Sequence, residues 1–147
     1  MERGRRIAFD FGDARIGVAV SDPDSILATP VATLETKSQD LWDQIFQLFS
    51  DYEPVEVFVG RPIHLAGHES DSTAKSELFA KEIHERFGLD VSLVDERLST
   101  VSAQRQLKDA GLSTRETKSA IDQAAAVGIL ELALETAKGR EKRKNNE

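Results

Sequence analysis

The stretch Ile7–Asp22, with the sequence IAFDFGDARIGVAVSD, decides how the rest of this chain is interpreted. Residues 7–11 and 18–20 have the composition of β-strands, and Gly12, a residue type common in turns, lies between them. The stretch therefore predicts two antiparallel strands. Asp10 stands at the end of the first run, where an acid near a core needs something to compensate its charge. Two interpretations are open at this point: a divalent cation compensates the charge, or Asp10 caps the turn through its own backbone.

Two more acidic positions favour the cation. Residues 91–94 form a short β-branched run that ends in Asp95 and Glu96, so a second strand also presents carboxylates at its carboxyl end. Asp122 lies among small apolar residues in a segment with the pattern of a helix (118–126), where a surface helix would carry Glu or Lys. Small neighbours allow such a helix to approach a sheet closely, and acids that converge repel one another unless a cation neutralises them. Oxygen ligands of this kind suit magnesium or manganese.

A pattern of alternating strands and helices follows the first two strands. The expected elements are a helix over 38–52 with Ser38 as its cap, a strand over 55–59, a helix over 71–87, a strand over 91–94, a helix over 100–110, and a helix that opens with the capping box Ser113-x-x-Glu116. This order indicates an α/β fold with a mixed sheet and helices on both faces. We expect one domain over 1–137 and a basic, flexible tail over 138–147.

The composition excludes several classes of protein. The chain has 147 residues and no cysteine, which excludes a disulfide framework and a thiolate metal site. No apolar run approaches the length of a membrane span, and the residues before Ile7 are too polar for a signal peptide, so we expect a cytoplasmic protein without a membrane partner. The net charge of −7 is unusual for a protein that binds nucleic acid, but basic residues gather between the second and third acidic motifs. This cluster comprises Arg97, Arg105, Lys108, Arg115 and Lys118.

Four sequence blocks, in this order, resemble the YqgF family. They are Asp10-Phe11-Gly12 with Arg15–Asp22, Val59-Gly60-x-Pro62, Asp95–Thr100 with Ala103, and Asp122-x-x-Ala125-Ala126. The resemblance extends from Ile7 to Leu134, and the ordered set is far more specific than its first block, which actin-like ATPases and sugar kinases share. The family comprises RNase H-like proteins described as Holliday junction resolvases and as nucleases for the 5′ end of pre-16S ribosomal RNA.

The resemblance implies a metal-dependent nuclease with an RNase H-like mixed sheet and helices on both faces. The acidic positions of the family correspond to Asp10, Glu96 and Asp122, which are the expected catalytic residues and the expected ligands of Mg²⁺ or Mn²⁺. Asp95 competes with Glu96 for this role, but adjacent strand residues face opposite ways and the family pattern favours Glu96. Such an enzyme hydrolyses phosphodiester bonds, with one ion activating a water molecule and the other stabilising the leaving oxygen.

The resemblance leaves the kind of nucleic acid open. The first interpretation is processing of the 5′ end of pre-16S rRNA in ribosome biogenesis, by a monomer or a homodimer. The alternatives are a resolvase that cuts Holliday junctions in DNA, and a ribosome-assembly factor that binds RNA or ribosomal particles without cleaving them. An actin-like ATPase is disfavoured, because such proteins enclose the nucleotide between two lobes and one short domain cannot supply both.

Basic side chains are expected to bind the phosphate backbone of the substrate. The candidates are Arg15, Arg97, Arg105, Lys108 and Arg115. One departure from the family pattern is Arg61, which stands where the family usually has leucine. It is either a harmless exposed substitution or an added phosphate contact. The neighbouring Gly60 either lets a substrate backbone approach or only ends a strand.

Overall fold

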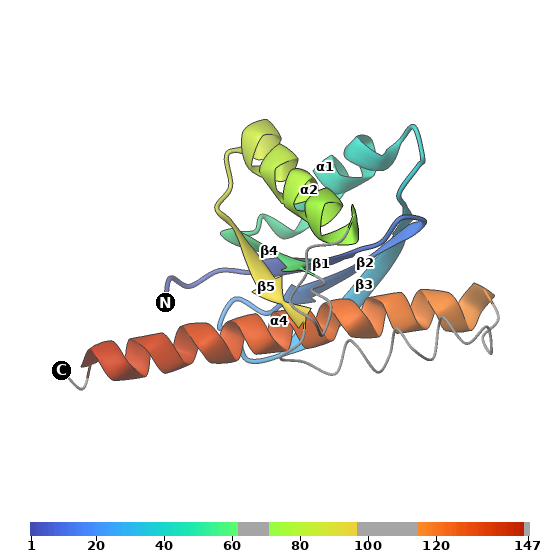
Figure 1. Ribbon diagram of the computed structural model, residues 1–147. Helices are drawn as coiled ribbons and strands as arrows, with labels where there is room; N and C mark the ends of the chain where they lie inside the picture. Colours follow the sequence, from blue (N-terminus) through green and yellow to red (C-terminus); the bar gives the residue numbers. More distant parts are fainter. Residues whose placement is uncertain (62–70, 97–114, 146–147) are drawn as a thin grey trace.

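The computed structural model describes residues 1–61, 71–96 and 115–145, which form a five-stranded sheet with helices on both faces (Figure 1). The strands are β1 (Arg6–Phe11), β2 (Arg15–Ser21), β3 (Ala28–Glu35), β4 (Glu56–Arg61) and β5 (Val91–Asp95), in the spatial order β3-β2-β1-β4-β5. β2 is antiparallel to both β1 and β3, whereas β4 is parallel to β1 and β5 is parallel to β4. This is the mixed sheet that the sequence predicts, and β1 lies at its centre.

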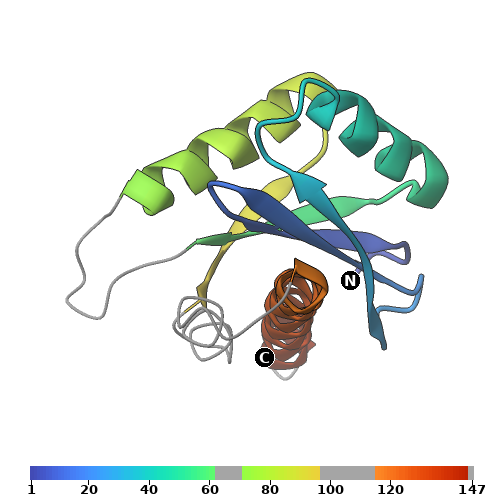
Figure 2. The ribbon, with the colours of Figure 1, turned by 90° about the vertical axis from the view of Figure 1, so that its right-hand side faces the viewer.

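The helices in the described part of the chain lie on opposite sides of the sheet. α1 (Leu41–Tyr52) and α2 (Asp71–Phe87) cover one face, which we call the α1/α2 face. α4 (Arg115–Asn145) crosses the other face, the α4 face, and Figure 2 shows α4 nearly end-on beneath the sheet. The predicted arrangement of helices on both faces is therefore confirmed.

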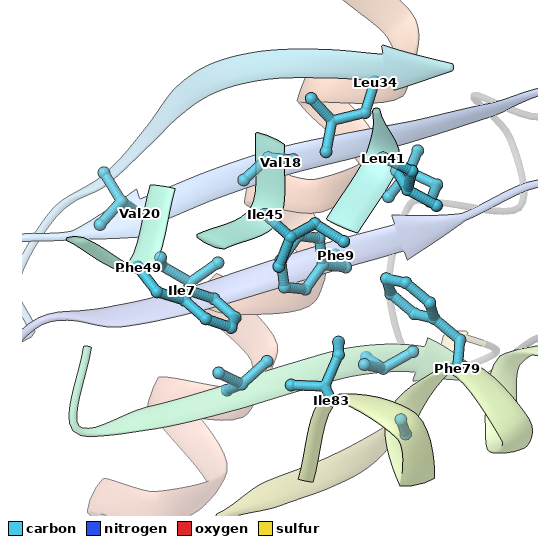
Figure 3. Packing of buried hydrophobic residues seen from close by; sticks show 14 residues of the cluster. Ile7, Phe9, Val18, Val20, Leu34, Leu41, Ile45, Phe49, Phe79 and Ile83 are labelled. Atoms are coloured by element: carbon cyan, nitrogen blue, oxygen red, sulfur yellow. The ribbon is translucent and has the colours of Figure 1, made fainter. Parts of the chain in front are cut away.

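β1 divides the core into two parts, because its side chains alternate between the two faces. Ile7 and Phe9 point to the α1/α2 face, where the ring of Phe9 lies edge-to-face with Phe49 and Phe79 at centroid distances of 6.1 and 5.5 Å (Figure 3). Ala8 belongs instead to the cluster on the α4 face, in which alanines are frequent. The bulky aromatic core thus lies on the α1/α2 face, and α4 packs on a surface of smaller residues.

α4 approaches the sheet closely. Its buried residues share one helical stripe; they are Asp122, Ala125, Ala126, Ile129, Leu130, Ala133 and Leu134. Gly17 of β2 lies against the start of this stripe, and a Cβ atom at Gly17 would collide with the backbone carbonyl of Asp122. The backbones of α4 and β2 are therefore in contact, which confirms the close approach predicted from the small neighbours of Asp122.

The sequence does not predict β3, which pairs with β2 along the edge of the sheet. Most of its side chains are exposed or half-buried, so the strand lacks an alternating apolar pattern. Pro30 lies inside the strand, and proline weakens a strand prediction because it cannot donate a ladder hydrogen bond. An edge strand tolerates proline, and the β2–β3 register shifts between Val18 and Ala19, next to the Ala19–Pro30 pair.

The start of α1 differs from the prediction. The helix begins at Leu41, and Asp40 occupies the capping position without a side-chain hydrogen bond to the helix. Ser38, the predicted cap, accepts a hydrogen bond at Oγ from the Asp40 N–H (3.1 Å) and so closes a turn ahead of the helix. As a helix cap, the Ser38 hydroxyl would accept a hydrogen bond from a backbone N–H of the first helical turn. In the structure it accepts one from a backbone N–H that precedes the helix.

The region where the sequence places a tail continues α4. The helix runs without a break to Asn145, and Lys138 Nζ donates a hydrogen bond to the carbonyl of Ser25 (2.7 Å). The division into a domain and a tail stays a prediction. The predicted helix over 100–110 and the capping residue Ser113 lie outside the described residues. Within the described ranges, none of the helices combines the length and the apolar character that a membrane span requires.

The contact at Gly17 gives the first testable prediction. Gly17→Ala should lower the free energy of unfolding by about 2–3 kcal/mol, because the added methyl group meets backbone, which cannot rotate away. Gly139→Ala is the matched control: it lies in α4 with no atom within 4 Å of an added Cβ. This control should raise the free energy of unfolding by up to about 1 kcal/mol. Urea denaturation of both variants measures the difference, and equal stability would contradict the described contact.

Candidate active site

Asp10 lies on the α4 face of the sheet. Ala8 belongs to the cluster on this face, and Asp10, two residues later in β1, points the same way. Only 2% of Asp10 is exposed to solvent. In the sheet, Asp10 pairs with Gly17 of β2, and Gly17 in turn pairs with Thr33 of β3. Asp10, Gly17 and Thr33 therefore form one row across three strands, and α4 crosses this row.

Asp122 reaches the same place from α4. Its backbone lies against Gly17, so Asp122 and Asp10 come together although they are far apart in the sequence. The Asp122 side chain is 1% exposed, and the Nε of Arg15 donates a hydrogen bond to its Oδ2 at 2.7 Å. Arg15, the first residue of β2, is 30% exposed. The guanidinium thus neutralises a carboxylate that is almost removed from water, an arrangement that a buried charge requires.

A group of hydroxyl and amide side chains holds this part of α4 against β3. Thr33 Oγ1 donates a hydrogen bond to the Ser119 carbonyl (3.0 Å) and accepts hydrogen bonds from Ser119 Oγ (2.9 Å) and Gln123 Nε2 (3.2 Å). Asp122 lies between Ser119 and Gln123 in the sequence, so these bonds fix the turn of helix that carries the acid. The sequence does not indicate this role of Thr33, because it does not predict β3.

Glu96 follows β5 directly and also faces α4. Its exposed fraction is 3%, and a Cβ atom at Gly60 would lie 2.6 Å from its Oε1 and would also collide with Ile129 of α4. Gly60 follows Val59, which pairs with Phe9 of β1, so Gly60 lies on β4 between the strand of Asp10 and the strand that leads to Glu96. The missing side chain leaves room for Glu96 and Ile129. This is a third role for Gly60, besides the two that the sequence left open.

Asp95 and Arg61 belong to the other face of the sheet. Val94 packs in the cluster on the α4 face, so alternation turns the next residue, Asp95, toward the α1/α2 face. Arg61 likewise follows the alternation of Val57 and Val59, which lie in the aromatic cluster, and its Nε donates to Glu77 Oε1 of α2 at 2.8 Å. Arg61 is thus bound to α2 on the face opposite the acids, which favours the interpretation of a harmless substitution.

The remaining basic candidates lie largely outside the described residues. This is the case for Arg97, Arg105, Lys108 and the side chain of Arg115, whose backbone begins α4. Arg15 is the basic candidate whose side chain the structure describes, and it pairs with Asp122. Gly17 and Gly60 are site residues whose structural role sequence reasoning missed. An isolated glycine inside a strand pattern, as in RIGVAVS, is the signal that points to such a close approach.

The donor chemistry of the three acids fits a divalent cation. Three nearly buried carboxylates on one face offer the oxygen ligands that Mg²⁺ and Mn²⁺ prefer, and each acid has at least one polar partner in the structure. Among the side chains of the described residues, no three His, Cys, Asp or Glu are already grouped as ligands of one ion. In the structure, the Oδ2 atom of Asp122 is engaged by Arg15.

Comparisons with known proteins agree with this fold. Residues 4–136 match the model of the RuvX family, described as "Holliday junction resolvase". A Streptomyces coelicolor protein is 48% identical over 138 residues, which cover 92% of this chain and 83% of the relative. A Mycolicibacterium smegmatis protein is 48% identical over 134 residues, which cover 88% and 79%. Both relatives are named "Putative pre-16S rRNA nuclease".

Solved structures of RuvC from Thermus thermophilus share the fold. One matches with a TM-score of 0.54 over 92% of this chain and 96% of that chain. A second, in complex with a Holliday junction, matches with a TM-score of 0.56 over the same shares. At 13% sequence identity, both likenesses concern the fold, which is RNase H-like. The family model and the relatives at 48% identity establish that the chain belongs to the RuvX family, the YqgF family that its motifs indicate.

Proposed function

We propose that this protein is a divalent-metal-dependent nuclease that hydrolyses phosphodiester bonds at the 5′ end of pre-16S rRNA in the cytoplasm. The observation that carries the proposal is that Asp10, Glu96 and Asp122 lie on the same face of the sheet, the α4 face, and that each is 3% exposed or less. Membership of the RuvX family and two relatives named as pre-16S rRNA nucleases support the reaction and the substrate. The proposed partners are precursor rRNA and ribosomal particles.

Asp10, Glu96 and Asp122 are the residues that would hold Mg²⁺ or Mn²⁺. When bound, such an ion lowers the pKa of a water molecule and stabilises charge on a phosphate oxygen. The burial of the three acids limits the competition of bulk water for their oxygens and strengthens their attraction for a cation. Gly17 and Gly60 keep α4 and Glu96 close to Asp10, and Thr33 fixes the turn of α4 that carries Asp122. The chain has no cysteine, which excludes a Cys–His nucleophile, and the histidine in the described part of the chain, His84, lies on α2 at the opposite face of the sheet.

A Holliday junction resolvase is the second candidate function. The description of the family model and the fold shared with RuvC favour it. A resolvase cuts two strands symmetrically, so it would act as a homodimer, whereas trimming of an RNA end needs one active site. Cleavage assays with structured precursor RNA, single-stranded RNA and a four-way DNA junction, run in parallel with Mg²⁺, separate the two functions. Binding without cleavage of any of them would indicate the assembly factor.

Asp10→Asn tests the role of the acids. The variant should fold, because the amide has nearly the same shape, and should lose about 10²-fold or more of the Mg²⁺-dependent cleavage rate. Asp13→Asn is the matched control: Asp13 is an acid close by in the sequence, but its side chain is 63% exposed and bound to Lys75. The control should cleave within about twofold of the parent. The rates are measured with equal amounts of folded protein, with and without chelator, and undiminished cleavage by Asp10→Asn would refute the mechanism.

Glu96→Gln and Asp95→Asn separate two neighbouring acids. Because Glu96 faces α4 and Asp95 faces the other way, Glu96→Gln should lower cleavage about 10²-fold with little change in melting temperature. Asp95→Asn should instead lower the free energy of unfolding by about 1 kcal/mol and leave cleavage within about threefold. Cleavage rates and thermal melting curves are measured for both. Equal losses of activity with unchanged melting temperatures would contradict the assignment.

The basic cluster between the acidic motifs is expected to follow the substrate backbone. Replacing Arg105, Lys108 and Arg115 by alanine should weaken binding to all sequences and should flatten the salt dependence of affinity. The slope is that of the logarithm of the binding constant against the logarithm of the salt concentration. Its magnitude should decrease by about 0.7–0.9 for each phosphate that a basic side chain no longer neutralises. Lys81→Ala, an exposed charge on α2 at the opposite face, is the control and should leave the slope unchanged. Affinity is measured against salt concentration, and an unchanged slope in the triple variant would place the nucleic acid elsewhere.

A further inference from the structure

We propose that Arg15 is an exchangeable counter-ion of Asp122: it neutralises this acid when no cation is bound, and a divalent cation displaces it. The released guanidinium then becomes available to a phosphate of the substrate in front of the acids. The proposal rests on the proposed function, because it assumes that Asp122 is a cation ligand. It adds an order of events, in which the cation binds before Arg15 is available to a phosphate.

The first observation is the unequal burial of the two partners. Asp122 is 1% exposed, and a charged carboxylate so removed from water needs an opposite charge and hydrogen bonds to compensate it. The Arg15 side chain is 30% exposed, so it already borders on solvent and loses little when it leaves the acid. The acid therefore depends on the pair much more than the arginine does.

The second observation is that the acid is fixed while the base is on a flexible side chain. The backbone of Asp122 lies against Gly17, and Ser119 and Gln123 on both sides of it are hydrogen-bonded to Thr33. Arg15 is the first residue of β2 and reaches the acid with a long side chain that has several rotatable bonds. When the partners separate, the guanidinium moves and the carboxylate stays in place.

The third observation concerns the charge of Arg15. A divalent cation held by Asp10, Glu96 and Asp122 would repel a guanidinium within a few ångströms, and this repulsion is strong where little water is present. The same guanidinium has a planar fork of N–H donors that matches a phosphate group. A cation at the acids and a phosphate in front of them would therefore place Arg15 on the phosphate. Arg15 thus pairs with the Asp122 carboxylate before the cation binds and with a substrate phosphate afterwards.

Isothermal titration of the full chain with Mn²⁺ or Mg²⁺ tests the exchange. Arg15→Ala removes the competitor and should bind the cation about tenfold more tightly than the parent, which corresponds to about 1.4 kcal/mol. Its melting temperature without cation should fall, and saturating cation should restore it. A purely structural role of Arg15 would predict weaker cation binding. Arg15→Lys keeps the charge and serves as a second variant in case Arg15→Ala folds poorly; its affinity should lie between those of the parent and Arg15→Ala.

Lys75→Ala is the matched control for net charge. Lys75 also carries one positive charge, but it pairs with Asp13 at 3.0 Å on the surface, where both side chains are more than half exposed. Its removal should change the affinity for the cation by less than about twofold. An increase as large as that of Arg15→Ala would show that general electrostatics, and not competition for Asp122, sets the affinity.

A double-mutant cycle locates the competition at one acid. In an Asp122→Asn background, Arg15→Ala should give no gain in cation affinity, since the shared carboxylate is gone. If the parent binds the cation and Arg15→Ala binds it no more tightly, the exchange is refuted while the nuclease proposal stands. If neither the parent nor Arg15→Ala binds the cation, both proposals fail.

Discussion

The contact between Gly17 of β2 and the backbone of Asp122 is the constraint on which the candidate site depends. At this point the helix and the strand meet without an intervening side chain, so the position of α4 is set by backbone atoms. Since Gly17 pairs with Asp10 on one side and with Thr33 on the other, the same contact places Asp122 beside one acid and its helix neighbours Ser119 and Gln123 within hydrogen-bond distance of Thr33. A bulkier residue in β2 would lift the helix and separate the carboxylates.

The two faces of the sheet provide different properties. On the α1/α2 face, rings such as Phe9, Phe49 and Phe79 bury a large apolar area and supply much of the driving force for folding. On the α4 face, alanines and glycines bury less area but allow close approach of backbone to backbone. The bulky aromatic side chains and the close backbone contacts thus lie on opposite faces of one sheet. The position of Asp10, in the central strand common to both faces, links the site to the aromatic core.

Local patterns in the sequence predict the elements whose residues contact the core, and miss those defined by distant partners. Apolar runs indicate β1, β2, β4 and β5, and the four-residue spacing of Phe79, Ile83 and Phe87 indicates α2. β3 is not predicted because its backbone is held by β2 while its side chains are largely exposed. The burial of Asp122 follows from its small neighbours, but its pairing with Arg15, 107 residues away, has no local signal.

The distance of α4 from β1 along the chain also has a consequence for the time at which the acids meet. Contacts between residues far apart in a chain carry a high entropic cost of closure and tend to form late in folding. Asp10 and Glu96 belong to the sheet and its margin, whereas Asp122 lies on α4, which packs on the surface formed by β2 and β3. A chain whose synthesis has reached only the end of β5 therefore contains the strands and the aromatic core but lacks the third carboxylate. Assembly of the acidic set is thereby tied to completion of the fold.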